Sequence, residues 1–180
     1  MKKTSIKFHL SPYSIRQKRQ TTINHAFASA IAPVDKYDVE RLDEALRLLG
    51  QDPDGELTCI YCGRPAETWD HLHGLVKNAN LSGFGHQLGN LVPCCKGCNS
   101  RKGAKDWEAF LKNELSEKAA FEEKHSLITN YRDRYVDRIN PAALAEKSPE
   151  DWNRYCEIKR HIISLMKEAD EIAEKLREDK

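Results

Sequence analysis

The chain has 180 residues, a formal net charge of +1, 39% hydrophobic residues and 32% charged residues. These values are typical of a soluble protein with one extended domain or two small ones, and no apolar run approaches the roughly 18 residues that a membrane span needs. The basic first residues precede no apolar stretch of signal-peptide length, so we expect a cytoplasmic protein.

The N-terminal segment is strongly basic. Residues 1–34 contain six Lys or Arg and no acidic residue. Such a segment, with Phe8 and Tyr13 among its side chains, is suited to lie along phosphates, and it is equally compatible with a mobile, solvated terminus. Because charge is distributed so unevenly, the net charge of the whole chain does not identify a partner.

A short packing helix is predicted over residues 35–49. Its apolar residues recur at helical spacing, and Gly50 is placed to end it in a left-handed turn. The stretch 51–55, QDPDG, has the composition of a turn and separates this helix from the next module. We therefore assign residues 1–56 to a basic N-terminal segment plus a short helix.

A central module is expected over residues 57–105. The β-branched and aromatic run 58–61 predicts a strand, and a second extended segment is expected around 68–72. A Gly-rich loop follows, and then a helix from about Cys95. The module is predicted to contain two strands and a helix.

The C-terminal region, residues 106–180, is predicted to be helical. Apolar residues recur at mostly helical intervals from Trp107 until Asn140 and Pro141, which predicts one long helix or two short ones. Ser148 and Pro149 favour a new helix start. Within this last helix a heptad-like seam either packs on its own domain or joins two copies in a coiled coil; its members are Tyr155, Ile158, Ile162, Leu165, Ala169, Ile172 and Leu176.

Two Cys-x-x-Cys pairs indicate a metal site. Cys59 with Cys62, and Cys95 with Cys98, supply four thiolates in the arrangement that a tetrahedral structural zinc ion prefers. Four sulfur ligands leave no open position for water, so this zinc is predicted to be structural and not catalytic. The alternative is a thiol redox protein, which would need an accessible thiolate of low pKa.

Three short motifs lie between and just after these pairs: WDHLH at 69–73, GNLVP at 89–93 and CNSRKG at 98–103. Over about residues 57–107 the sequence resembles the HNH nuclease family. That family has a ββα-metal fold with Asp-His on the first strand, Asn before the helix and His or Asn on the helix. The last position is Asn in this chain, so it resembles the HNN variant.

The resemblance implies a role for each matching position. Asp70 and Asn99 would be ligands of a catalytic metal, His71 the general base, and Asn90 the residue that braces the loop and orients the histidine. Phosphodiester hydrolysis requires an activated water and a cation that stabilises the charge on phosphorus and the leaving oxygen. Oxygen ligands suit Mg²⁺ or Mn²⁺.

Some nearby residues have more than one interpretation. His73 would share a strand face with His71, so geometry alone leaves its role open, although the resemblance favours His71. Arg101, Lys102 and Lys105 either contact DNA phosphates or form a solvated helix face. We interpret His86 as a solvated loop histidine outside the catalytic set.

Together with the resemblance, the sequence predicts an α+β protein with a ββα-metal core, a four-cysteine structural zinc site and mainly helical flanks. The implied function is metal-dependent cleavage of double-stranded DNA, with a site-specific restriction endonuclease as the preferred role. A homodimer would match a symmetric DNA site. The alternative is a zinc-stabilised nucleic-acid-binding module without nuclease activity.

Overall fold

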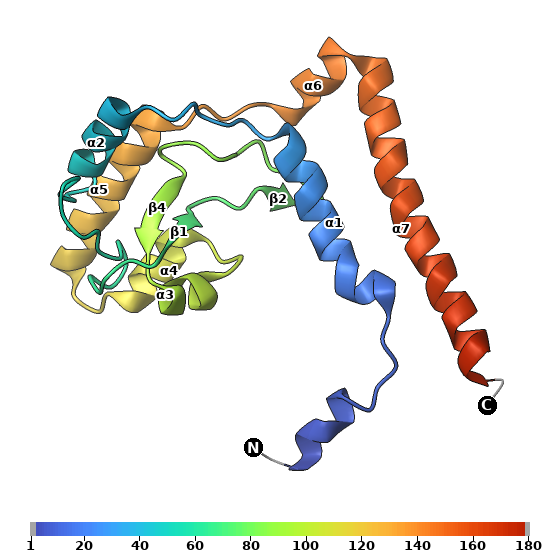
Figure 1. Cartoon of the computed structure of the whole chain (residues 1–180). Helices are drawn as coiled ribbons and strands as arrows, with labels where there is room; N and C mark the ends of the chain where they lie inside the picture. Colours follow the sequence, from blue (N-terminus) through green and yellow to red (C-terminus); the bar gives the residue numbers. More distant parts are fainter. Residues whose placement is uncertain (1–2, 179–180) are drawn as a thin grey trace. The chain divides into compact units, whose positions relative to one another are not determined.

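The computed structural model describes residues 3–178 and shows an α+β chain (Figure 1). No helix in this described range is long and apolar enough to cross a membrane. The elements in chain order are the 3-10 helix η1 (Lys3–Phe8), α1 (Ile15–Ile31), α2 (Val39–Leu48), β1 (Thr68–His71), β2 (Val76–Lys77), β3 (Asn80–Leu81), β4 (Leu91–Cys94), α3 (Lys96–Lys102), α4 (Trp107–Glu114), α5 (Lys118–Tyr135), α6 (Pro141–Lys147) and α7 (Pro149–Glu178).

The chain divides into two compact units. One comprises residues 1–27 and 142–180, and the other residues 28–141. The module boundaries expected after residues 56 and 105 both lie inside the second unit. They do so because α2, α4 and α5 contribute to the same hydrophobic core as the cysteine-containing segments.

In the first unit, α1 and α7 are antiparallel partners. The Asp170 carboxylate accepts hydrogen bonds from the backbone N–H groups of Ile15 (2.6 Å) and Arg16 (3.1 Å), which caps the N-terminus of α1. Near the other end of α1, the Tyr155 hydroxyl donates to the Phe27 carbonyl at 2.8 Å. The start of α7 at Pro149 agrees with the sequence prediction, whereas α1 was not predicted.

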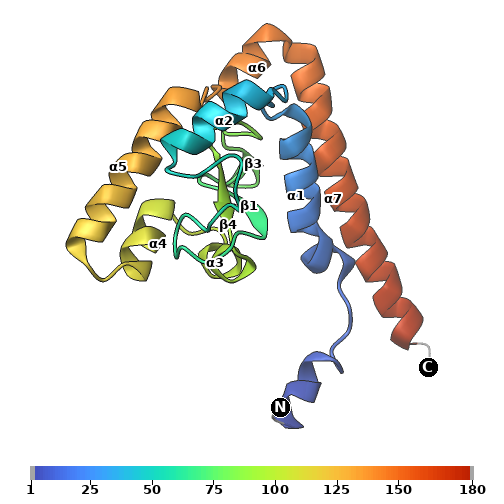
Figure 2. The same ribbon diagram turned by 60° about the vertical axis from the view of Figure 1, so that its left-hand side comes forward.

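In the second unit, β1 and β4 form an antiparallel pair, and α3 begins two residues after β4 (Figure 2). The register places Thr68 opposite Cys94 and His71 opposite Leu91. A small hairpin of β2 and β3 lies between these two strands in the sequence. The order of the main elements is therefore strand, strand, helix.

The predicted strand at residues 58–61 is wrong. This segment forms a turn in which the Gly63 N–H donates to the Cys59 carbonyl at 2.8 Å, and Thr58 makes only an isolated bridge with Pro65. The chain must curl here to bring Cys59 and Cys62 together, and a strand would hold it extended. The partner of β1 is β4.

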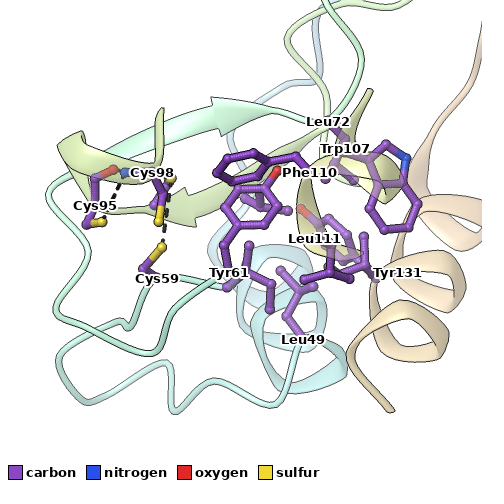
Figure 3. Close-up of a cluster of buried hydrophobic side chains, with 14 of the residues drawn as sticks. Leu49, Cys59, Tyr61, Leu72, Cys95, Cys98, Trp107, Phe110, Leu111 and Tyr131 are labelled. Carbon is purple, nitrogen blue, oxygen red and sulfur yellow. Dashed lines mark hydrogen bonds between the residues drawn. The ribbon is translucent and has the colours of Figure 1, made fainter. Parts of the chain in front are cut away.

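The core of the second unit lies beside the cysteines. Tyr61 packs edge-on against Phe110, with ring centroids 5.1 Å apart, and Leu49, Leu111 and Tyr131 fill the space beyond them (Figure 3). The α2 helix ends at Leu48, Leu49 is its C-cap residue, and Gly50, with a φ of +68°, provides the left-handed turn predicted from the sequence.

Candidate functional site

The cysteine pairs form one cluster. The sulfur atoms of Cys59, Cys62, Cys95 and Cys98 all lie within 4.8 Å of one another. The first pair lies in the turn before β1, and the second lies at the start of α3, where Cys95 is the N-cap. Among the described residues, this is the one group of three or more His, Cys, Asp or Glu side chains that could hold a metal ion.

The spacing within the cluster suits zinc. Cys62 Sγ lies 3.7 Å from Cys95 Sγ, and a zinc tetrahedron with Zn–S bonds of about 2.3 Å has sulfur atoms about 3.8 Å apart. A disulfide would bring the two sulfur atoms to about 2.05 Å, so these thiols are not bonded to each other. The residues present therefore fit a zinc site with four cysteine ligands.

Two arginines surround the thiols. Arg64 donates through Nε to Cys62 Sγ (3.4 Å) and through Nη2 to Cys95 Sγ (3.6 Å). Arg101 donates through Nη2 to Cys98 Sγ (3.3 Å) and also pairs with Glu114. Four thiolates around one Zn²⁺ would carry a net charge of −2, which two guanidinium groups offset. Arg101, a predicted phosphate contact, lies against the cysteine cluster in the structure.

The fifth cysteine of this region, Cys94, is adjacent to the cluster but plays a different part. Its sulfur lies 3.9 Å from Cys59 Sγ and is fully buried. The hydrogen bond with Cys59, together with burial, raises the pKa of the Cys94 thiol. Cys94 is therefore expected to remain a protonated thiol within the core.

We expect Cys62→Ser to lose zinc and stability. Loss of a structural metal costs several kcal/mol, and each kcal/mol corresponds to a shift of about 2–4 °C in a chain of this size, so the melting temperature should fall by at least about 10 °C. The matched control is Cys156→Ser in α7. Elemental analysis should find one zinc per chain in the parent and in this control. Full zinc occupancy in Cys62→Ser would contradict the assignment.

Asp70 and His71 are neighbours on β1, and adjacent strand residues point to opposite faces. Asp70 is 6% exposed, and its carboxylate accepts a hydrogen bond from the Tyr61 hydroxyl at 3.0 Å. The ammonium of Lys102 lies 3.1 Å from the same carboxylate oxygen. Burial raises the pKa of Asp70, and the Lys102 and Tyr61 contacts oppose this rise.

Lys102 connects the helix to the end of the strand. It is 2% exposed, and its ammonium also donates to the His71 carbonyl at 2.7 Å. Lys102 was considered as a phosphate contact, but in the structure its ammonium binds the Asp70 carboxylate and the His71 carbonyl. Asn99 lies three residues earlier on α3 and is half-buried. Lys105 is exposed beyond the end of α3.

His71 faces a second histidine that the sequence had not indicated as part of the site. Its Nε2 lies 3.1 Å from Nδ1 of His86, and the two rings are close to perpendicular at 69°. His73 has a different neighbour, since its ring stacks on Phe84 with centroids 4.2 Å apart. Burial, reinforced by Arg132, lowers the pKa of His73.

Asn90 joins the two segments that carry these histidines. It is fully buried, and its side-chain oxygen accepts a hydrogen bond from the His73 N–H at 2.8 Å. Its amide nitrogen donates to the carbonyls of His73 (3.1 Å) and Gly85 (2.9 Å). All three contacts are to backbone groups, so Asn90 holds the chain after β1 against the loop before β4.

Comparisons with known proteins found no matching family model, no matching curated protein and no matching solved structure. The assignment of function therefore depends on the site itself.

The Asp70–Lys102 pair yields a stability prediction. Lys102→Met would leave a buried carboxylate without its cation, which costs about 3–5 kcal/mol of unfolding free energy. Adding Asp70→Asn should recover part of this loss, because the uncompensated charge is then removed. Lys105→Met, at an exposed position, should stay within about 0.5 kcal/mol of the parent. Urea unfolding of the zinc-loaded proteins measures all three, and equal losses for the two lysine variants would contradict the pairing.

Proposed function

We propose that the chain is a metal-dependent endonuclease of the HNH type that hydrolyses phosphodiester bonds in double-stranded DNA. One observation supports this proposal: in an antiparallel pair followed by a helix, the Asn90 side chain binds the His73 N–H, and the Lys102 ammonium binds both the Asp70 carboxylate and the His71 carbonyl. His71 ends β1, Asn90 immediately precedes β4, and Asn99 lies on α3. The hydrogen bonds of Asn90 and Lys102 thus join the three HNH-like motifs, which are separate in the sequence.

His71 is the proposed general base. A neutral imidazole with an unperturbed pKa of about 6.5 accepts a proton from water at neutral pH. The resulting hydroxide oxygen forms a bond to phosphorus, the bond to the leaving oxygen breaks, and that oxygen takes a proton from solvent. Asn90 sets the position of the backbone on both sides of the site, so it keeps the histidine in place while the reaction proceeds.

Asp70 and Asn99 are the proposed holders of Mg²⁺ or Mn²⁺. One carboxylate and one amide oxygen are the donor types that such hard cations prefer. Because the Asp70 carboxylate is paired with Lys102, the ammonium would have to give way when a divalent ion binds. Such an ion, when bound, would stabilise the negative charge that develops on the phosphate and the leaving oxygen.

The nuclease proposal is tested by plasmid cleavage. We expect the zinc-loaded protein to cut DNA with Mg²⁺ or Mn²⁺ and not with EDTA, and His71→Ala to reduce the rate by a factor of about 10²–10⁴, the usual contribution of a general base. His161→Ala, an exposed histidine of α7, is the matched control and should cut at the parent rate. Metal-dependent cleavage that persists in His71→Ala would contradict the assigned base.

Discrete fragments from phage or plasmid DNA would support the finer proposal of a restriction endonuclease. A homodimer suits that role, because two-fold symmetry of the protein matches a palindromic site. The support for a dimer comes from α7, where Ile158, Leu165 and Ile172 are exposed at seven-residue spacing. This is the spacing of a coiled-coil seam.

The dimer proposal predicts a specific effect of one substitution. Leu165→Asp should convert a particle of twice the 20.6 kDa chain mass into a monomer, because it places a charge in the seam. Ser164→Asp introduces the same charge on the neighbouring exposed position and should leave the dimer intact. Sedimentation velocity distinguishes the two species, and a monomeric parent would remove this part of the proposal.

The second candidate function is a zinc-stabilised nucleic-acid-binding module without hydrolysis. It is favoured by the burial of Asp70 and by its pairing with Lys102, since both features belong to a structural ion pair as well. This candidate predicts DNA binding by a protein that leaves plasmid intact in Mg²⁺ and Mn²⁺.

A further inference from the structure

His86 is held in place by backbone contacts on both sides. Its N–H donates to the Pro33 carbonyl at 2.9 Å, and its own carbonyl accepts from the Asp35 N–H at 3.1 Å. Gly85 allows this close approach, because a Cβ there would lie 1.9 Å from the Pro33 oxygen. The Asn90 amide also binds the Gly85 carbonyl. These hydrogen bonds hold the backbone of His86 in one position relative to Pro33, Asp35 and Asn90.

The contact between His86 and His71 has a chemical requirement. At a separation of 3.1 Å between His71 Nε2 and His86 Nδ1, one nitrogen must carry the proton and the other must accept it. If His86 were the donor, His71 would accept through Nε2 and carry its proton on Nδ1. The lone pair on His71 Nε2 would then accept the proton of His86 Nδ1 and would not be available to water.

We propose that His86 is a positioning residue that accepts a hydrogen bond from His71 Nε2–H through its own Nδ1 and so fixes His71 in the tautomer whose Nδ1 acts as the base. This inference rests on the proposed nuclease function and deepens it. When His71 takes the proton of water on Nδ1, its Nε2–H bond to His86 becomes a charge-assisted hydrogen bond and stabilises the imidazolium. His86 itself neither gains nor loses a proton.

Three substitutions separate this role from a packing role. In His86→Asn the side-chain oxygen stands close to the place of Nδ1, so the acceptor is kept. In His86→Gln the amide reaches the place of Nε2, and in His86→Ala no acceptor remains. Partners that orient a metal-ligating histidine typically contribute 10- to 100-fold, and a partner that orients a general base acts in the same way. We expect about this loss in the single-turnover rate of His86→Ala and His86→Gln at saturating protein, with most of the rate restored in His86→Asn.

If the single-turnover rates of all three variants fell in step with their melting temperatures, the positioning role would be overturned. A packing defect would follow stability and would not be rescued by Asn. Parent-like rates in His86→Ala would overturn it as well. His161→Ala again serves as the matched control for removal of a histidine.

A measurement independent of cleavage reports the tautomers. In the full zinc-loaded chain labelled with ¹⁵N-histidine, at a pH of about 8 where an unperturbed histidine is neutral, we expect the proton of His71 on Nε2 and an unprotonated Nδ1 in His86. A proton on His86 Nδ1 would overturn the inference even if DNA is cleaved. The expected tautomers in a protein that cleaves no DNA would instead overturn the proposed nuclease function, and the catalytic role of His86 with it.

Discussion

The rest of the second unit depends on the contact among four thiols. Cys59 and Cys62 precede β1, and Cys95 and Cys98 begin α3, so the cluster joins the two ends of a segment whose regular structure is slight. A two-stranded sheet of this size is at best marginally stable alone. A structural zinc supplies on the order of 10 kcal/mol of apparent folding free energy, enough to hold such a segment in one conformation.

The cysteine cluster also accounts for the positions of several basic side chains in this unit. A zinc ion bound by four thiolates would form a dianion, and Arg64 and Arg101 both direct guanidinium groups at sulfur atoms of the cysteine cluster. Lys102, one residue after Arg101, is used in the interior by Asp70. Basic residues of α3 that the sequence suggested for DNA phosphates therefore act first as counter-charges, and Lys105 is the one of the three predicted contacts that the structure leaves exposed without such a role.

Sequence reasoning succeeded where a feature is encoded locally. The Cys-x-x-Cys pairs, the α2 helix followed by Gly50 and the start of α7 each have a short-range signal, and the structure contains all of them. The strand predicted at 58–61 is wrong because the β-branched and aromatic residues there lie in the turn that brings Cys59 and Cys62 together. The α1 helix was not predicted because its apolar residues form no regular stripe.

The candidate site was predictable only in part for a related reason. His71, Asn90 and Asp70 occur in recognisable motifs, but His86 is a single histidine in a loop. Its place is set by backbone contacts with Pro33 and Asp35, about fifty residues earlier, which no local pattern reveals. The burial of Lys102 was also hidden, because a seven-residue helix carries too little periodicity to show which face meets the strands.

If zinc binds at the four thiolates, it should hold β1, which carries His71, together with β4 and α3. Hydrogen exchange measured by mass spectrometry, before and after a chelator removes zinc, tests this most directly. The account predicts that protection is lost together in β1, β4 and α3 as zinc leaves, while α7 retains its protection as an internal reference. Unchanged protection in β1 and β4 after complete loss of zinc would contradict it.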